Sequence, residues 1–464
     1  MFGHLGYRDP EHDLWMRKIA IIGSGITGLA AAHGLLRSGF DVSVYSDRTA
    51  EEWLNESRPT GTAARFDLAL SYERELGLNY WDDVAPKGEG VFLTFCPVLH
   101  NPLVTLAGRL RQPFQAVDVR LQSARWMNEF ERRGGHLIIE KVAGDRLDDI
   151  AAQHDLTIVA AGRADLCNLF KRDEARSSYQ TAQRHLAMVI VTGCPASFSE
   201  VPFRPVRFDF LGTDGEIFFI PYYHKDAGVT WNILVEAKPG SRMDRFADVQ
   251  NGDDVVERVR SVIGDLFPWD RQFVSQMKLA DPLGWLVGKV VPVVRHPSAT
   301  LASGRVLAAL GDTVISHDPI AAQGANGGMK QARHLVGKIA ERGSMPFDQE
   351  WIVSTFEEFY REHGSDAVTF SNLLLEPLTA PAKEMLIAQY GSDGGAGNMS
   401  AQQRIANAFV ENFNDPRLLT PAFTDLTLAR KTIASQSGGR WLWSSVRGRM
   451  SIARNQVKVK LGRS

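Results

Sequence analysis

Apolar residues recur with two different periods between positions 17 and 47, and their order predicts a strand, a helix and a second strand. Residues 19–22 form a short continuous apolar run, which is typical of a strand buried on both faces. A helix rich in small residues follows, and residues 42–45 are again rich in β-branched side chains. The sequence GSGITG, from Gly23 to Gly28, lies between the first strand and the helix. This order predicts a dinucleotide-binding βαβ unit.

Each glycine of this motif has a physical role in such a unit. Gly23 allows a sharp turn off the strand, and Gly25, which has no Cβ, lets a pyrophosphate approach the backbone. Gly28 allows the helix to pack closely on the sheet. The pyrophosphate then accepts hydrogen bonds from free N–H groups at the positive end of the helix. A GxGxxG motif alone is weak evidence, but the flanking elements strengthen it here.

The acidic residue that usually binds the ribose is displaced in this sequence. It normally ends the second strand, about 20 residues after the motif. That place is taken by Ser46, and Asp47 follows it. Asp47 is therefore the candidate for the ribose contact, and Arg48 is the candidate for a contact with the adenine or a phosphate.

The next part of the chain continues the alternation of strands and helices. We expect a loop through residue 62, a helix over 66–78, and strands over 91–97 and 104–110. Residues 116–121 lead into a helix that ends near 133, and Arg120 at this corner is either a surface charge or a group that faces an anion. Strands are expected over 136–140 and 155–162. The second of these ends in Ala161 and Gly162, small residues across which a cofactor could lie.

The pattern changes between residues 183 and 292. Strand-like runs over 187–191, 206–211, 217–223 and 229–235 follow one another with connections too short for crossover helices. Such spacing predicts an antiparallel sheet, and therefore a second domain with one intervening helix over 253–267.

A second glycine-rich stretch follows a buried strand expected over 306–310. It contains Gly311 and Asp312, then Pro319, and then Gly324, Ala325 and Asn326, before a helix with an apolar face from Met329. Asp312 could accept a hydrogen bond from a ribityl hydroxyl, and the amides of 324–326 could hold an anionic ring edge. Alone, this stretch could equally be a glycine-rich loop with a helix cap. With the βαβ unit, it is the other half of one cofactor site.

These elements predict an α/β protein with a Rossmann-like FAD-binding domain, an inserted antiparallel-sheet substrate domain and a helical C-terminal region. The expected divisions are an N-terminal extension (1–16), which an upstream start codon would also explain, the FAD-binding domain (17–182 and 293–345), the substrate domain (183–292), the C-terminal helices (346–437) and a basic tail (438–464). The tail has no acidic residue and begins with an aromatic segment, so it either docks on an anionic membrane or partner, or is a solvated or packed helix.

Composition narrows the function classes. The chain has 464 residues and a formal net charge of −2, which does not suggest a nucleic-acid partner. Three widely spaced cysteines form neither a metal pattern nor a disulfide framework, so we expect a cytoplasmic protein with no metal site. No apolar run is long enough for a membrane span.

The two glycine regions, separated by an antiparallel domain, resemble the FAD-dependent aromatic hydroxylase superfamily, and within it the styrene and indole monooxygenase family. The resemblance covers residues 18–432 and rests on five segments: 42–48 (VSVYSDR), 116–121 (AVDVRL), 290–292 (VVP), 318–326 (DPIAAQGAN) and 411–414 (ENFN). The sequence departs from the family at Arg65 and Gly61, where histidine and asparagine are usual.

The resemblance implies a two-component monooxygenase. A separate NADH-dependent flavin reductase would supply reduced FAD, and reaction with O2 would form a C4a-hydroperoxyflavin that oxygenates a small hydrophobic aromatic substrate such as a styrene-like alkene, indole or a sulfide. It implies no certain catalytic side chain and leaves a homodimer open. The implied FAD contacts are Gly23, Ser24, Gly25, Ile26, Thr27, Gly28, Ser46, Asp47, Arg48, Arg58, Arg120, Ala161, Gly162, Gly311, Asp312, Pro319, Gly324, Ala325 and Asn326. The implied substrate pocket consists of Gly61, Arg65, Val290, Val291 and Pro292.

Three alternatives stay open. One is a single-component flavin hydroxylase or N-hydroxylase that uses NAD(P)H directly. Another is a flavin-dependent halogenase, which is disfavoured because the sequence lacks a Trp-x-Trp-x-Ile motif. The third is a flavin-binding protein without turnover.

Overall fold

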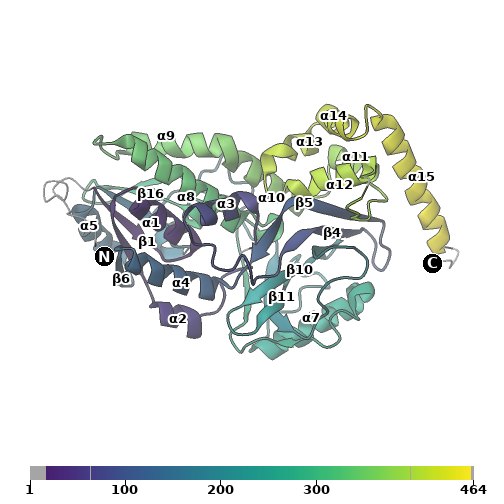
Figure 1. Ribbon diagram of the computed structural model, residues 1–464, viewed down its shortest axis with the longest axis horizontal. Coiled ribbons are helices and arrows are strands. Elements are labelled where there is room, and N and C mark those ends of the chain that lie inside the picture. Colours follow the sequence, from purple (N-terminus) through teal and green to yellow (C-terminus); the bar gives the residue numbers. More distant parts are fainter. Residues whose placement is uncertain (1–16, 63, 163, 398, 461–464) are drawn as a thin grey trace, which may run out of the picture.

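A parallel sheet forms one half of the molecule and confirms the expected βαβ unit (Figure 1). The structure is a computed structural model that describes residues 17–460 except 63, 163 and 398, so the expected N-terminal extension over 1–16 lies outside the described residues. Five strands are mutually parallel, and only the edge strand β15 pairs in the antiparallel sense. In spatial order the strands are β15 (Ser298–Thr300), β16 (Val306–Ala309), β7 (Leu156–Val159), β1 (Lys18–Ile22), β2 (Asp41–Ser46) and β6 (His136–Ile139).

A second, nine-stranded sheet forms the other half. In spatial order its strands are β12 (Lys278–Leu279), β8 (His185–Thr192), β11 (Gly228–Ala237), β10 (Gly215–His224), β9 (Pro205–Leu211), β4 (Gly88–Cys96), β5 (Val104–Ala116) and β3 (Ala64–Arg65), with β13 (Trp285–Lys289) also paired to β8. The antiparallel run β8 to β11 is as expected. The sheet also includes β3, β4 and β5, which lie before residue 183, because β4 pairs in parallel with β9. The limits of the two domains stay predictions.

The helices cover both sheets. Against the parallel sheet lie α1 (Ile26–Arg37), α2 (Ala50–Asn55), α3 (Asp67–Glu75), α4 (Val119–Arg132), α5 (Gly144–Gln153) and α8 (Gln323–Arg342), and α7 (Gly252–Leu266) covers the second sheet. The C-terminal region is helical as expected: α9 (Gln349–Phe359), the π-helix η4 (Tyr360–Gly364), α10 (Ser365–Leu375), α11 (Ala380–Ala388), α12 (Ala401–Glu411), α13 (Thr420–Thr424), α14 (Leu426–Gln436) and α15 (Trp441–Lys460). The remaining elements are α6 (Ala164–Cys167), β14 (Val293–Val294), β17 (Ile315–Ser316) and the short helices η1 (Pro268–Asp270), η2 (Gly311–Thr313), η3 (Pro319–Ala321) and η5 (Pro416–Leu418).

Helix α8 begins earlier than the sequence pattern indicates. The apolar face starts at Met329, but the helix starts at Gln323, so the expected loop residues Gly324, Ala325 and Asn326 form its first turn. The reason is local: Ala322 adopts the left-handed conformation, with φ 53°, and turns the chain directly into the helix. The N–H groups that could bind an anion therefore belong to a helix terminus.

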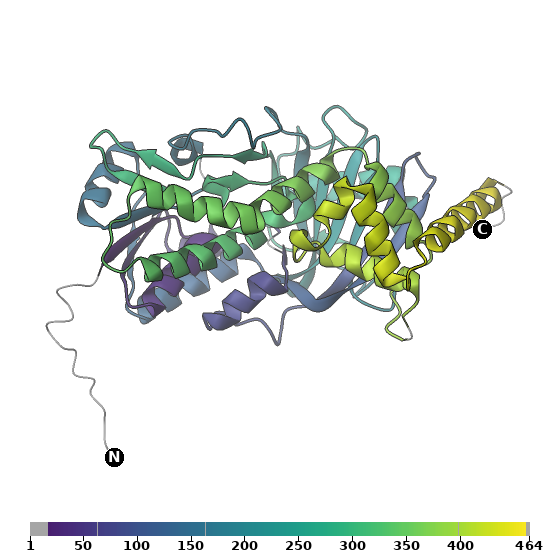
Figure 2. The ribbon, with the colours of Figure 1, turned by 90° about the horizontal axis from the view of Figure 1, so that it is seen from above.

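The predicted tail contains an ordered helix at one outer end of the molecule (Figures 1 and 2). This helix, α15, packs on α11 and α14, as the packed-helix alternative expected. In the described part of the chain, no helix combines the length and the apolar character that crossing a bilayer requires.

Candidate functional site

Three neighbouring parallel strands bring the predicted cofactor segments to one edge of the first sheet. Strands β16, β7 and β1 are adjacent, so the chain leaves all three at their carboxyl ends on the same side. Gly23, with φ 120°, lies so close to Ala160 that a Cβ would collide with its carbonyl oxygen. A Cβ on Gly28 would collide with the carbonyl oxygen of Gly23, whereas one on Gly25 would meet nothing within 4 Å. Gly23 and Gly28 are thus required for packing, and space remains only beside Gly25.

Ser46, at the position where an acidic residue usually binds the ribose, forms a buried hydrogen bond with Ser24. Ser46 is fully buried, and its hydroxyl lies 2.7 Å from the hydroxyl of Ser24, which also accepts a hydrogen bond from the Trp53 indole at 3.0 Å. Asp47 is exposed at the end of β2 and binds the Arg48 guanidinium, with an Nε–Oδ1 distance of 3.1 Å. Arg48 also donates to Ser57 and lies over the Trp53 ring. Asp47 and Arg48 therefore lie where the prediction puts them, but they contact each other.

The second glycine region meets the first. A Cβ built on Gly162 would lie 3.8 Å from Cβ of Asp312, and one on Gly324 would lie 3.8 Å from its Oδ1. Asp312 is exposed to solvent, but atoms of these segments surround it closely. The resulting loss of hydration raises the pKa of its carboxyl group, and the charge of Arg295 acts to lower it. Thr27 packs against Gly311, whose N–H donates to the Gln331 side chain at 2.8 Å. The structure thus assembles both predicted halves around Asp312.

The first turn of α8 offers free backbone donors, but one predicted side chain is already used. The first four N–H groups of a helix have no partner within it, which leaves the amides of Gly324 and Ala325 available. The Asn326 side chain accepts from the N–H of Phe66 and donates to the carbonyl oxygens of Ala64 and Ala322. Asn326 therefore holds β3 against this turn, next to Pro319 in η3.

The five predicted pocket residues and Arg58 lie in different surroundings. Arg65 is fully buried in an ion pair with Glu73, so its charge is engaged inside the protein. Arg58 lies over the Trp285 ring, 3.7 Å from its centroid, and joins the first half to the second sheet. Gly61 has open space around it. Val290, Val291 and Pro292 form the connection between β13 and β14, with Pro292 buried and Val291 exposed.

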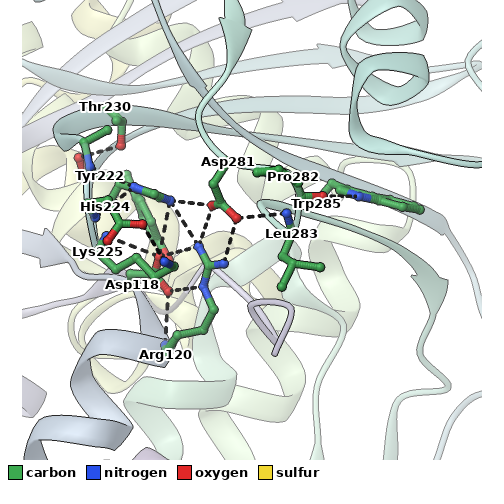
Figure 3. A network of polar contacts seen from close by, with 12 residues as sticks. Asp118, Arg120, Tyr222, His224, Lys225, Thr230, Asp281, Pro282, Leu283 and Trp285 are labelled. Atoms are coloured by element: carbon green, nitrogen blue, oxygen red, sulfur yellow. Dashed lines mark hydrogen bonds and ion pairs between the residues drawn. The ribbon is translucent and has the colours of Figure 1, made fainter. Parts of the chain in front are cut away.

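Arg120 is not a surface charge, because it is fully buried between two carboxylates (Figure 3). Its guanidinium donates to Asp118 at 2.7 and 2.9 Å and to Asp281 at 2.9 and 3.1 Å, and His224 Nε2 lies 2.5 Å from Asp281. Burial alone would lower the pKa of Arg120, but the two carboxylates outweigh it and raise the pKa. Burial would raise the pKa of Asp281, but hydrogen bonds from His224 and Arg120 lower it. Because Asp118 precedes α4 and Asp281 follows β12, this network joins the two halves of the molecule.

Sequence inspection missed one face of the second sheet. Tyr222 on β10 and Asn232 and Glu236 on β11 point to the same face, because residues two apart on a strand do so and Glu216 pairs with Glu236 in the register. All three are buried, and among the described residues the Tyr222 hydroxyl and both polar atoms of the Asn232 amide lack a hydrogen-bond partner, while the carboxyl group of Glu236 faces that of Asp318. Buried polar groups are normally paired, so the unpaired ones on this face need a water molecule or a ligand in contact with them. The alternation of polar and apolar residues along β11 is the only signal in the sequence.

The same face carries a cluster of buried charged residues beside the second glycine-rich stretch. Arg184 forms a bidentate ion pair with Glu216, at 2.7 and 3.0 Å, and the side chain of Arg184 is 3% exposed. Burial raises the pKa of Glu236 well above its usual range, and Asp318 and Glu216 raise it further against the effect of Arg184. Burial also raises the pKa of Asp318, which precedes Pro319. One arginine lies among three buried carboxyl groups, so both burial and the neighbouring carboxyl groups favour the protonated form of Glu236.

We expect Glu236→Gln to remove part of the pH dependence of stability. Because the folded-state pKa of Glu236 is raised, its contribution is fully present below the unfolded value, about 4.3, and is lost as pH rises toward the folded value. The slope is about 1 kcal/mol per pH unit in that window. Glutamine imitates the protonated acid, so in denaturant unfolding the variant should match the parent near pH 4 and become increasingly more stable than the parent toward pH 8. The exposed Glu257→Gln is the control, and parallel curves for Glu236→Gln and the parent would contradict this assignment.

The structure has a small pocket at this sheet edge and an open cleft on the second sheet. A small pocket is lined by Gly311, Gly324 and Gly327 together with His317, Lys330 and His363. Burial lowers the pKa of both histidines to about 4 and that of Lys330 to about 8, which agrees with a structural role for His317. An open cleft of about 710 Å³ lies on the second sheet, between β4, β5 and the segment before β9, and no predicted cofactor residue lines it.

The residues at the sheet edge fit a flavin dinucleotide. Gly25 leaves room for a pyrophosphate beside the first turn of α1, Asp312 is placed for a ribityl hydroxyl, and the first turn of α8 offers amide donors. The connection at Val290–Pro292 and the unpaired polar side chains on β10 and β11 lie on the other half of the molecule. The two halves therefore carry separate sets of polar groups, one at the edge of the first sheet and one on a face of the second sheet.

Two family models match separate parts of the chain. Residues 21–73 match the family described as "NAD(P)-binding Rossmann-like domain", and residues 162–272 match "Styrene monooxygenase A putative substrate binding domain". The chain is 28% identical over 420 residues to styrene monooxygenase StyA of Pseudomonas fluorescens, covering 86% of this chain and 93% of that protein. StyA of a second Pseudomonas is also 28% identical, over 412 residues.

Solved structures show the same fold at low sequence identity. The flavin-dependent brominase Bmp2 superposes with a TM-score of 0.60 at 13% identity, covering 96% of this chain and all of that one. A flavoprotein/dehydrogenase from Cytophaga hutchinsonii has a TM-score of 0.59 at 13% identity, covering 88% of this chain and 99% of that one. The expected fold class is confirmed.

Proposed function

The chain belongs to the styrene monooxygenase family, and from this premise we propose that it is a flavin-dependent monooxygenase that oxygenates a small hydrophobic aromatic substrate. The observation that carries the proposal is the meeting of Gly25, Gly162, Asp312 and the first turn of α8 at one sheet edge. Such an edge is where open α/β sheets bind ligands.

We further propose that FAD arrives reduced from a separate NADH-dependent reductase and that O2 is the co-substrate. When bound, the flavin supplies two electrons, one oxygen atom enters the substrate and the other leaves as water. The protein would hold the dinucleotide through Gly23–Gly28 and Asp312, direct amides toward the ring through α8, and exclude water with the apolar face around Ile220 and Ile320.

The proposed substrates are styrene-like alkenes, indole or sulfides. Support comes from the buried face of the second sheet, where Phe218, Ile220 and Tyr222 pack in one apolar cluster with Ile320 and Ala321 of the flavin loop. Arg65 and Gly61, where the family usually has histidine and asparagine, are proposed as sources of a different substrate preference. The cytoplasm is the proposed location.

A turnover assay with labelled oxygen tests this function. The chain, with chemically reduced FAD and ¹⁸O2, is mixed with styrene, indole or a thioether, and the products are examined by mass spectrometry. One ¹⁸O atom in the product, with no product from NADH and oxidised FAD alone, is the expected result. Product formation from NADH and FAD alone would favour a single-component hydroxylase. Stoichiometric FAD binding without any product would favour a flavin-binding protein without turnover.

We expect Asp312→Ala to weaken FAD binding by tenfold or more. A hydrogen bond to a charged group is worth about 1.5–3 kcal/mol, and no other acidic side chain lies beside Gly162 and Gly324 in the contacts of these two glycines. The dissociation constant is measured by flavin fluorescence quenching at constant pH. Asp248→Ala, at an exposed ion pair, is the control. An unchanged dissociation constant for Asp312→Ala would remove Asp312 from the site.

A further inference from the structure

Among the side chains that the structure describes, helix α15 contacts the body through one face. On that face Ser445 donates to Glu384 at 2.7 Å, and Arg449 binds the other oxygen of this carboxylate at 2.9 Å. A Cβ on Gly448 would collide with the carbonyl oxygen of Ile387, so the helix lies close against α11. At its start, Trp441 packs beneath the guanidinium of Arg430, 4.5 Å away. These contacts set the rotation of the helix about its axis.

The opposite face carries a row of large apolar side chains open to solvent. Leu442, Trp443, Val446 and Met450 are 59%, 66%, 41% and 53% exposed, and Ala453 is also exposed. Spacings of three and four residues place them in one stripe along the helix. These four are among fourteen exposed large apolar side chains in the described part of the chain, and Trp443 is the most exposed of them. Single exposed apolar residues are normal, but a continuous row indicates a contact surface.

The charges on this helix are all of one sign. Residues 438–464 contain no acidic residue, and helical spacing places Arg447 and Arg454 along one border of the stripe and Arg449 along the other. Pairing of the stripe with its copy on a second chain would bring these arginines together, and like charges at such a seam are destabilising. The surface that covers the stripe therefore has to combine an apolar layer with negative charge.

We propose that α15 docks the protein on an anionic lipid bilayer, lying in the plane of the membrane surface. Leu442, Trp443, Val446 and Met450 would enter the headgroup boundary, and Arg447 and Arg454 would bind lipid phosphates. Tryptophan favours this boundary because its ring is apolar while its N–H stays hydrated. Figures 1 and 2 both place α15 at an outer end of the molecule. The inference does not depend on the proposed function.

Vesicle co-sedimentation of the full chain tests the proposal. The vesicles contain either phosphatidylcholine alone or an equimolar mixture with phosphatidylglycerol. We expect binding only to the anionic vesicles, and weaker binding as salt increases. Arg447→Gln with Arg454→Gln should weaken binding about twenty-five-fold, because each cation near such a surface contributes about fivefold. Trp443→Ser with Met450→Ser should weaken it by about tenfold or more.

Control variants elsewhere on the surface test whether binding depends on α15 itself or on the total charge and apolar surface of the protein. Arg132→Gln with Arg258→Gln removes the same charge elsewhere, and Val229→Ser with Met345→Ser removes two other apolar residues, 58% and 57% exposed. Both controls should bind like the parent. Absence of binding to anionic vesicles, or equal binding by the Trp443 and Met450 variant, would overturn the proposal. Sedimentation equilibrium that shows a dimer dependent on the stripe would also overturn it, in favour of self-association.

Discussion

Replacing Gly25 with valine is expected to reduce FAD affinity at least about a hundredfold while the flavin-free protein stays folded. The backbone of Gly25, with φ −74° and ψ 173°, is open to any residue, and a Cβ there meets nothing within 4 Å. The added side chain would fill the space beside the N–H groups of α1 that the pyrophosphate needs. Loss of two hydrogen bonds to charged oxygens, at about 1.5–3 kcal/mol each, accounts for the magnitude.

Two other glycine variants make this test specific. Gly337→Val also enters open space, within α8, and should leave FAD affinity unchanged. Gly28→Val would collide with the Gly23 carbonyl oxygen and should lower the thermal midpoint of the flavin-free protein. FAD binding is measured by fluorescence titration and unfolding by circular dichroism. A Gly25→Val protein that binds FAD like the parent would contradict the location of the pyrophosphate.

Replacing Arg120 with methionine is expected to cost about 3–5 kcal/mol of unfolding free energy at pH 7. Removing one partner of a buried ion pair leaves the other charge without compensation. Arg120 and Asp118 are fully buried, and the side chain of Asp281 is 12% exposed, so two carboxylates would lose their cation together. Since these groups come from both halves of the molecule, we also expect the two halves to be held together less tightly.

The pH dependence identifies the mechanism of this loss. The pKa of Asp281 is lowered in the folded state, so its stabilising contribution is present above the unfolded value, about 3.9, and is lost as pH falls through the folded value. The difference between Arg120→Met and the parent should therefore shrink as pH falls below about 4. Arg132→Met removes an exposed arginine of α4, and because Arg133 also binds Glu129, this variant should lose much less stability than Arg120→Met at any pH. A deficit for Arg120→Met that is constant with pH would indicate lost packing instead.

The sequence predicted the βαβ unit well because its signals are local. A glycine motif between a strand and a helix determines a backbone path over a few residues, and Gly23, with φ 120°, follows the expected path. The start of α8 was placed too late because the apolar period begins at Met329, whereas the turn depends on the left-handed conformation of Ala322. Periodicity reports the buried face of a helix, and it does not report where the first turn begins.

The polar face of β10 and β11 and the junction between the two halves could not be predicted in this way. Tyr222, Asn232 and Glu236 meet only because β10 and β11 pair in one register, and β4 joins that sheet through a partner more than a hundred residues away. Arg120 was equally compatible with a surface charge until the loop after β12 placed Asp281 against it.

The sequence by itself determined the Rossmann-like βαβ unit, the strand-rich middle region and the chemistry of the glycine loops, because short-range sterics and side-chain periodicity control them. Tertiary structure alone decided which charges are buried, which polar groups on the second sheet lack partners, and which face of α15 stays open. These properties depend on contacts between residues far apart in the chain, and the free energy of burial is set only when those contacts form.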